Sequence, residues 1–273
     1  MAIKYQYNFN SFVGIDYSGA KFADTPLAGL QVYQSFPQSS VVGVSPKNHG
    51  NTRAKHWTRI AIADWIRCEI EKRGPIIVGI DHGFSFPISF FKKNGLTNWY
   101  DFLRDFRIFW PTDQPGCSVE SVRNGEWWSN GKIKPPGERV GSPSELRLCE
   151  KFTSSATSVF RLQGQGTVGK STHAGLPWLL FLKENFGDQI HFWPFDGFTP
   201  APGITVIAEM YPSIFRRRYL RSEKSADQHD AFVLSSWLQE VHQEKLLEKY
   251  FNLELSPDKI RIAEIEGWIL GIL

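Results

Sequence analysis

Four carboxylic acids stand where apolar runs of the sequence give way to a turn or where a helix begins. Asp16 ends the apolar part of 11–19, Asp81 ends the run 75–81, and Glu209 lies near the end of ITVIAE. Asp230 lies in the first turn of a stretch with helical periodicity. In open α/β sheets, ligands bind in the crevice beyond the carboxyl ends of the strands. These positions predict that the four carboxylates meet at one site.

Carboxylates held this close together repel one another, and divalent cations remove that repulsion. Clustered oxygen ligands suit Mg²⁺ or Mn²⁺, and two such ions about 4 Å apart activate water and stabilise the leaving oxygen of a phosphodiester. Asp227, one turn before Asp230, is a further candidate ligand. Ordinary structural roles stay open for single members. Asp16 or Asp81 could be a turn former, Asp227 a helix N-cap, and Asp230 a complement to the helix dipole.

The elements that would carry these acids follow from apolar periodicity and turn residues. Strands are predicted over 11–19, 27–36, 39–46, 75–81, 158–163, 189–195 and 204–212, and helices over about 53–73, 174–186 and 227–246. Asn51 or Thr52 is the predicted cap of the first helix. Short links join the first three strands and predict an antiparallel meander, while the later strands follow crossover connections. The order predicts an α/β fold with a mixed sheet and helices on both faces.

Residues 88–157 differ from the rest of the chain. They contain a helical patch over 98–109 and a stretch rich in Pro, Gly and Trp. We interpret 88–157 as an insertion after the fourth strand, partly mobile, within a single domain that spans 1–273.

The composition is that of a globular protein. The chain has 273 residues, of which 41% are hydrophobic and 22% charged, with a net charge of +3. This weakly basic balance is compatible with a nucleic-acid partner without requiring one. Apolar runs stay short of the roughly 18 residues that a membrane helix needs. The first residues, MAIKYQYNFN, lack a signal peptide's apolar segment, and the three cysteines are an odd number. We therefore expect a cytoplasmic protein.

Residues 164–171, GQGTVGKS, satisfy the P-loop pattern G-x-x-x-x-G-K-S. A P-loop delivers its phosphate to the N-terminus of an unbroken helix, and Pro177 is expected to break the helix in its second turn. We therefore do not predict an NTPase. Two interpretations of the loop stay open. Gly164, Gly166, Gly169 and Lys170 bind a substrate phosphate, or the loop is a structural turn.

Arg217 lies in the run Arg216–Arg218, which is followed by Arg221. These arginines could bind phosphates, or they could form a solvated helix end. Arg217 is the predicted substrate-binding residue of the run.

Five motifs resemble a known family. VGIDYSGAK, VGIDHGFSFP, IAEMYPS, DQHDAFVLSSWL and EGWI occur in the order seen in the predicted-nuclease family catalogued as domain of unknown function 429, within the ribonuclease-H-like superfamily. The resemblance implies a ribonuclease-H-like fold with Asp16 on the first strand, Asp81 on the fourth, Glu209 on the fifth and Asp230 on the final helix. It leaves 88–157 uncovered and does not imply a substrate. Ribonuclease H also carries a glutamate on its first helix, whereas Glu69 and Glu71 lie too near the end of the predicted helix.

We therefore expect a metal-dependent nuclease that binds nucleic acid or another phosphate-containing substrate, with Asp16 bridging two ions. One alternative is an actin-like or sugar-kinase-like ATP-dependent phosphotransferase, because residues 16–19 resemble the first phosphate loop of that superfamily. Such enzymes use two domains of this fold, which is more than 273 residues usually hold. A non-catalytic nucleic-acid-binding protein is the other alternative.

Overall fold

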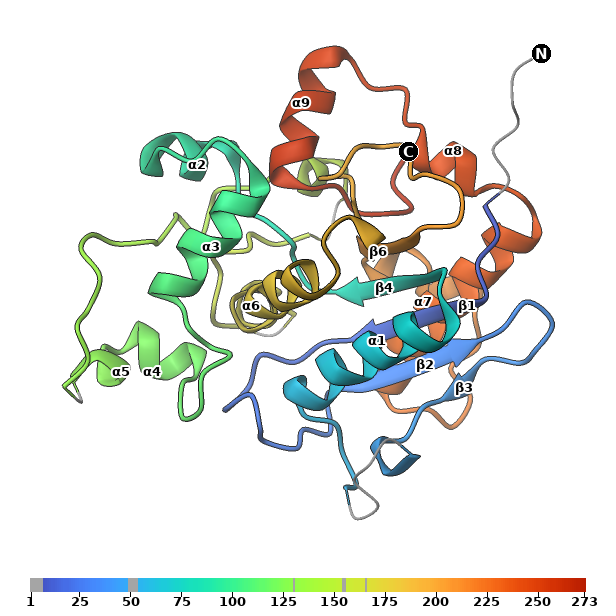
Figure 1. Ribbon diagram of the computed structural model, residues 1–273, viewed down its shortest axis with the longest axis horizontal. Coiled ribbons are helices and arrows are strands. Elements are labelled where there is room, and N and C mark those ends of the chain that lie inside the picture. The colour runs from blue at the N-terminus through green and yellow to red at the C-terminus, as the bar shows by residue number, and fades with distance from the viewer. Residues whose placement is uncertain (1–6, 49–53, 130, 154–155, 165) are drawn as a thin grey trace.

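The computed structural model describes residues 7–48, 54–129, 131–153, 156–164 and 166–273. Within these ranges one six-stranded mixed sheet forms the centre of the fold (Figure 1). Its strands are β1 (Ser11–Asp16), β2 (Gln31–Ser35), β3 (Val42–Gly43), β4 (Ile76–Asp81), β5 (Ile190–Trp193) and β6 (Thr205–Glu209). The spatial order is β3-β2-β1-β4-β6-β5, in which β1 to β3 are antiparallel neighbours and β1, β4, β6 and β5 run parallel. The predicted meander and mixed sheet are confirmed.

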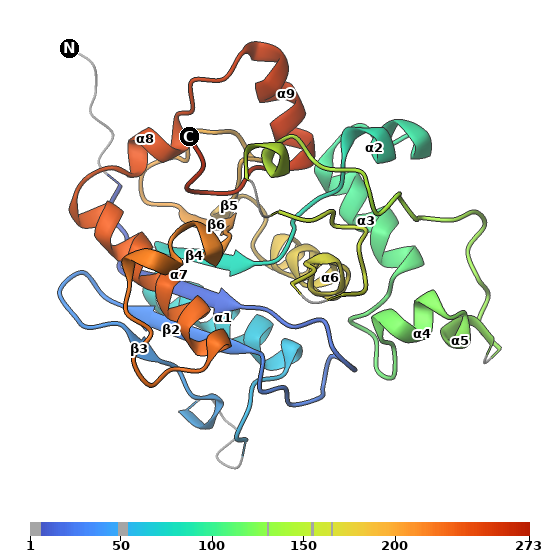
Figure 2. The ribbon, with the colours of Figure 1, turned by 180° about the vertical axis from the view of Figure 1, so that it is seen from behind.

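Helices cover both faces of the sheet. α7 (Ala226–Gln243) lies along one face, and α1 (Arg59–Arg73) and α6 (Gly169–Phe186) lie along the other (Figures 1 and 2). Successive side chains of each strand point alternately toward these two layers, as in any pleated sheet. Val13 and Ile15 join the hydrophobic cluster of α1 and α6, whereas Phe12 joins the cluster of α7.

Two glycines on the α7 face of the sheet leave room for close contacts, and Gly14 lets the backbone of α7 itself approach. A Cβ atom on Gly14 would overlap the carbonyl oxygen of Ala231, and one on Gly79 would overlap the Met210 side chain. Glycine in a strand often marks such an approach of another backbone. Asp230 precedes Ala231, so this contact holds the N-terminal part of α7 against the end of β1.

The segment 88–157 forms α2 (Ile88–Asn94), α3 (Trp99–Phe109), α4 (Val119–Arg123) and α5 (Glu126–Ser129), beyond the end of the sheet at which β1 and β4 terminate (Figure 1). α3 confirms the helix expected over 98–109. Phe91, Phe102 and Phe106 are fully buried and belong to the same hydrophobic cluster as α1 and α6. The segment therefore shares the core of the sheet.

The remaining helices are α8 (Leu247–Phe251), α9 (Pro257–Glu266) and the 3-10 helices η1 (Pro46–Asn48), η2 (Cys149–Phe152), η3 (Gly187–Gln189), η4 (Pro212–Ile214) and η5 (Arg216–Arg218). Among the residues that the structure describes, no helix combines the length and the apolar character needed to cross a membrane.

Three sequence-based expectations about local structure are wrong. α1 begins at Arg59, where the Thr58 hydroxyl accepts a hydrogen bond from the Ala61 amide, rather than near residue 53. The predicted caps Asn51 and Thr52 lie outside the described residues. Residues 158–163 form a turn, closed by the hydrogen bond from the Arg161 amide to the Ser158 carbonyl, and not a strand.

The third correction concerns Pro177, which lies inside α6 without ending it. A proline within a helix leaves the carbonyl four residues earlier without its amide partner. Here that carbonyl belongs to His173, and the Thr112 hydroxyl donates a hydrogen bond to it at 2.8 Å. A side chain from the segment between α3 and α4 thus replaces the missing helical hydrogen bond.

Candidate metal centre

Asp16 and Asp81 end two adjacent parallel strands in register. They are Cα partners at the last position of the β1–β4 pair. Side chains at directly opposed positions point to the same face of a sheet, and the face is that of Gly14 and Gly79, which α7 covers. The two carboxylates therefore emerge side by side beneath the first turn of α7.

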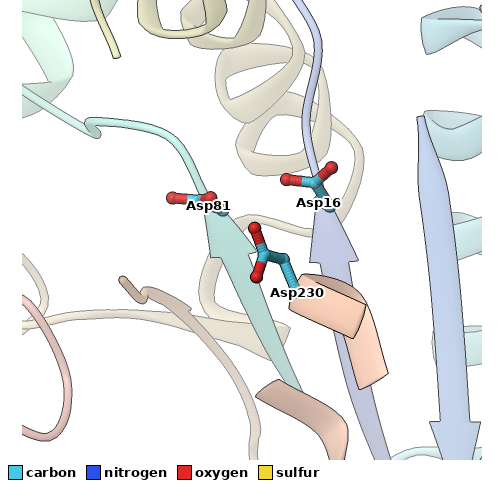
Figure 3. Close-up of side chains that lie close together, drawn as sticks. All are labelled: Asp16, Asp81 and Asp230. Atoms are coloured by element: carbon cyan, nitrogen blue, oxygen red, sulfur yellow. The ribbon is translucent and has the colours of Figure 1, made fainter. Parts of the chain in front are cut away.

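Asp230 completes a cluster of three. Ser225 caps α7 and forms a capping box with Gln228, which fixes the start of the helix. The close approach at Gly14 brings that first turn over the strand ends, and Asp230 points toward the space between Asp16 and Asp81 (Figure 3). One carboxylate oxygen from each aspartate lies within 4.8 Å of those of the other two. The structure thus brings together three of the four acids that the sequence singled out.

Burial and mutual repulsion dominate the electrostatics of the cluster. Burial, followed by the charges of Asp81, Asp227 and Asp230, raises the pKa of Asp16 to about 10. Burial and the charge of Asp230 raise the pKa of Asp81 to about 8, although Arg216 and a hydrogen bond from Asp16 oppose the shift. Without a nearby cation of sufficient charge, the cluster therefore retains protons at neutral pH.

Arg216 supplies one cation. Its Nε donates to Asp230 Oδ1 at 2.6 Å and its Nη2 donates to Oδ2 at 2.5 Å, a two-pronged ion pair. The Arg216 charge also offsets part of the rise in the pKa of both Asp16 and Asp81. The sequence marked Arg216 only as part of an arginine run, because nothing in the run distinguishes the member that reaches the cluster.

Glu209 does not join the three aspartates, contrary to the sequence-based expectation. It pairs in register with Ile80, one residue before Asp81, and therefore points to the opposite face of the sheet. Both of its oxygens bind the Arg147 guanidinium, at 2.7 and 2.5 Å, and Oε2 also accepts from the Phe84 amide. Glu209 also lies on the sixth strand in chain order rather than the fifth.

Arg147 is a buried neighbour of the cluster that the sequence did not reveal, because its partners come from distant segments. The fully buried guanidinium contacts Glu209, Glu150 and the Glu266 main-chain carbonyl. The Glu266 carboxylate accepts from the amides of Ile88 and Leu148. This Arg147 network connects the segment 88–157, strand β6 and helix α9 beside the metal candidates.

Asp227 lies in the first turn of α7 but is not its cap, which is Ser225. Its Oδ2 is 3.7 Å from the position that a Cβ atom on Gly29 would occupy, so it faces the loop before β2. Its charge contributes to the raised pKa of Asp16. Asp227 thus borders the cluster without belonging to the group of three.

Gly166 of the predicted phosphate-binding loop lies near Asp81 and Glu209. Gly166 borders a pocket of about 40 Å³ that Asp81, His82, Arg147 and Glu209 also line. Gly164 and Gly166 adopt positive φ angles of 110° and 71°, which a glycine accommodates without strain.

The two remaining loop candidates, Gly169 and Lys170, are held by other parts of the protein. Gly169 is the first residue of α6 and is buried, and a Cβ atom there would overlap the Arg161 carbonyl oxygen. Lys170 forms an ion pair with Glu120. Arg217 is exposed on η5, beside Arg216.

The donor set suits a hard divalent cation. Three carboxylates offer oxygen ligands from two strands and one capped helix, and their geometry requires little rearrangement to surround one ion. The raised pKa values of Asp16 and Asp81 express the cost of charging the cluster, and a bound divalent cation would remove that cost. Asp16, Asp81 and Asp230 are therefore the residues that fit a metal.

The chain matches no protein-family model, no curated protein and no solved structure.

Proposed function

We propose that the protein is a metal-dependent phosphodiester hydrolase in which Asp16, Asp81 and Asp230 bind Mg²⁺ or Mn²⁺. The observation that carries the proposal is the meeting of three largely buried aspartates within 4.8 Å, with Arg216 as a neighbouring cation. A bound divalent ion would activate water and stabilise the charge that develops on the phosphate oxygens.

The arrangement of the strands supports a ribonuclease-H-like fold for this chain. Three antiparallel strands lead through α1 to β4, which pairs in parallel with β1, and the late helix α7 packs against both strands on one face of the sheet. This agrees with the resemblance of the five sequence motifs to the predicted-nuclease family in placing Asp16 on the first strand and Asp81 on the fourth, whereas Asp230 lies on α7, which α8 and α9 follow, and not on the final helix. The proposal departs from that resemblance at Glu209, which we assign to the Arg147 network instead of the metal.

The chain's own residues have distinct tasks in this proposal. Asp16 and Asp81 hold their carboxylates at a fixed spacing because β1 and β4 are in register. Asp230 closes the cluster from above, with its position set by the α7 cap and by the contact at Gly14. The turn that follows Asp16 is fixed by Arg59, which donates to the carbonyls of residues 18, 20 and 21.

Substrates of the proposed class are phosphodiesters, with nucleic acid as the polymer to test first. The purified protein should be assayed with single-stranded and double-stranded DNA, RNA, RNA–DNA hybrids and bis(p-nitrophenyl) phosphate, each with Mg²⁺, Mn²⁺ or EDTA. We expect cleavage of at least one of them that requires metal. Asp16→Asn and Asp81→Asn should lower the rate by at least about a hundredfold, because metal stabilisation of the transition state contributes several kcal/mol.

Asp258→Asn is a matched control, because Asp258 lies on the exposed start of α9 and pairs only with Arg261 in the described structure. Its cleavage rate should equal that of the wild type. Metal-independent cleavage, or equal rates for Asp16→Asn and Asp258→Asn, would contradict the proposal.

A further inference from the structure

The Arg216 guanidinium occupies both oxygens of Asp230, the aspartate that α7 contributes to the cluster. The Nε and Nη2 groups each donate to one oxygen, which is the two-pronged geometry of a charge-assisted arginine–carboxylate pair. The Asp230 side chain is only 11% exposed, whereas that of Arg216 is 48% exposed. One partner of the pair is thus enclosed by protein and the other reaches solvent.

A divalent cation between the three aspartates would lie close to this guanidinium. The two cations would compete for the same carboxylate oxygens, and their like charges would repel over a few ångströms in a partly buried setting. The repulsion between the two cations therefore weakens the binding of each one to Asp230 when the other is present.

The packing around Asp230 and Arg216 indicates which of the two side chains can move. Asp230 is held by the capping box of α7 and by the contact of Ala231 with Gly14. Arg216 begins the three-residue 3-10 helix η5 on the surface, and its long side chain has rotamers that lead into solvent. Displacement of the guanidinium needs only side-chain rotation, whereas displacement of the aspartate would unpack α7.

We propose that Arg216 is a resident counter-cation of the aspartate cluster and that a divalent metal ion displaces it from Asp230. The inference rests on the proposed function only in that the three aspartates bind the ion. The metal-free protein is held by an internal ion pair, and metal affinity is lower than the three carboxylates alone would give. Metal binding releases the Arg216 guanidinium into solvent, beside Arg217.

The test is the affinity for Mn²⁺ itself, measured by the electron paramagnetic resonance signal of free Mn²⁺ for wild type, Arg216→Ala, Arg216→Gln and Arg217→Ala. Removing the competing charge should tighten Mn²⁺ binding at least about tenfold in both Arg216 variants. Arg217→Ala is the matched control from the same turn and should bind like the wild type. Adding Asp81→Asn to Arg216→Gln should abolish the tight binding, which would locate it at the cluster.

The wild type offers a second readout that no folding defect can mimic. The Arg216 Nε–H proton should give a resolved, slowly exchanging NMR signal without metal, and that signal should disappear on addition of Mg²⁺. If wild type binds Mn²⁺ while both Arg216 variants bind it equally or more weakly, or if the Nε–H signal persists at saturating Mg²⁺, the displacement is wrong and the metal site stands. If none of the four proteins binds Mn²⁺, both the displacement and the proposed function fail.

Discussion

Asp16 and Asp81 are direct Cα partners at the last position of two adjacent parallel strands, and both carboxylates lie beside Asp230 of α7. Their spacing is therefore a property of the sheet and needs no loop to maintain it. Asp230 adds a third carboxylate from a capped helix, so all three groups are held by regular secondary structure.

The metal-free protein should lose stability as the pH rises. The pKa of Asp16 is about 10 and that of Asp81 about 8 in the folded chain, against an ordinary value of 3.8. Below about pH 4 both groups are protonated whether the chain is folded or unfolded. Above that pH the unfolded chain releases protons that the folded chain keeps, so stability falls until the folded groups ionise. The buried His82 and His173 have pKa values lowered to about 4, so they are neutral in the folded and the unfolded chain above about pH 7. Thermal melts in EDTA from pH 7 to pH 9 should therefore show a falling melting temperature.

Asp16→Asn should flatten this fall, because Asp16 has the higher of the two raised carboxyl pKa values. With Mg²⁺ the dependence should reverse for the wild type, since metal binds the deprotonated carboxylates and gains affinity as the pH rises. Equal slopes for wild type and Asp16→Asn in EDTA, with no effect of Mg²⁺ on either, would refute the electrostatic description of the cluster.

Sequence patterns located the three aspartates because each one follows from a local rule. Asp16 and Asp81 end apolar strands, and Asp230 lies on the inward side of an amphipathic helix. The same rules placed Glu209 with the aspartates, which is wrong, because the face on which its side chain lies depends on the register between β6 and β4. A shift by one residue exchanges the two faces of a strand.

Tertiary partners explain the other differences between expectation and structure. Pro177 is tolerated in α6 because Thr112 donates to the freed His173 carbonyl, a contact between positions 61 residues apart. Arg147 pairs with Glu209, 62 residues away, and Arg216 pairs with Asp230, 14 residues away. Periodicity and capping rules describe neighbours in sequence and carry no information about such pairs.

Glu209→Gln should destabilise the protein without weakening metal binding. The substitution leaves the buried Arg147 charge without its strongest partner, and breaking a buried ion pair in this way costs about 3 kcal/mol. Urea denaturation should measure the loss. Glu71→Gln removes an exposed pair with Arg67 and should change stability by less than about 1 kcal/mol. A tenfold or greater loss of Mn²⁺ affinity in Glu209→Gln would return Glu209 to the metal ligands.

Gly14→Ala should weaken both stability and metal binding. The new methyl group would overlap the Ala231 carbonyl oxygen, so α7 must shift away from β1 and carry Asp230 with it. We expect a loss of about 3 kcal/mol in urea denaturation, at the upper end of overpacking effects. Gly43→Ala is the control, because its methyl group would meet only ordinary contacts with the Tyr33 ring. Similar losses in the two variants would show that the approach of α7 is not limited at Gly14.

The loop 164–171 should not bind ATP in the manner of a P-loop, although α6 continues unbroken through Pro177. No strand precedes it among the described residues 156–164, the space at Gly169 is filled by the Arg161 backbone, and Lys170 is paired with Glu120. Calorimetric titration with Mg²⁺ and ATP should give no signal that depends on Lys170. Tight ATP binding that Lys170→Ala abolishes and Asp16→Asn leaves intact would identify an NTPase site.

The metal-site proposal is tested most directly by crystals grown or soaked with Mn²⁺ and measured at a wavelength where manganese scatters anomalously. The proposal predicts a manganese peak within about 2.5 Å of carboxylate oxygens of Asp16, Asp81 and Asp230. The peak should be absent from crystals of Asp16→Asn treated in the same way. Wild-type crystals at saturating Mn²⁺ that contain no manganese between these three aspartates, or that bind it only elsewhere, would contradict the proposal.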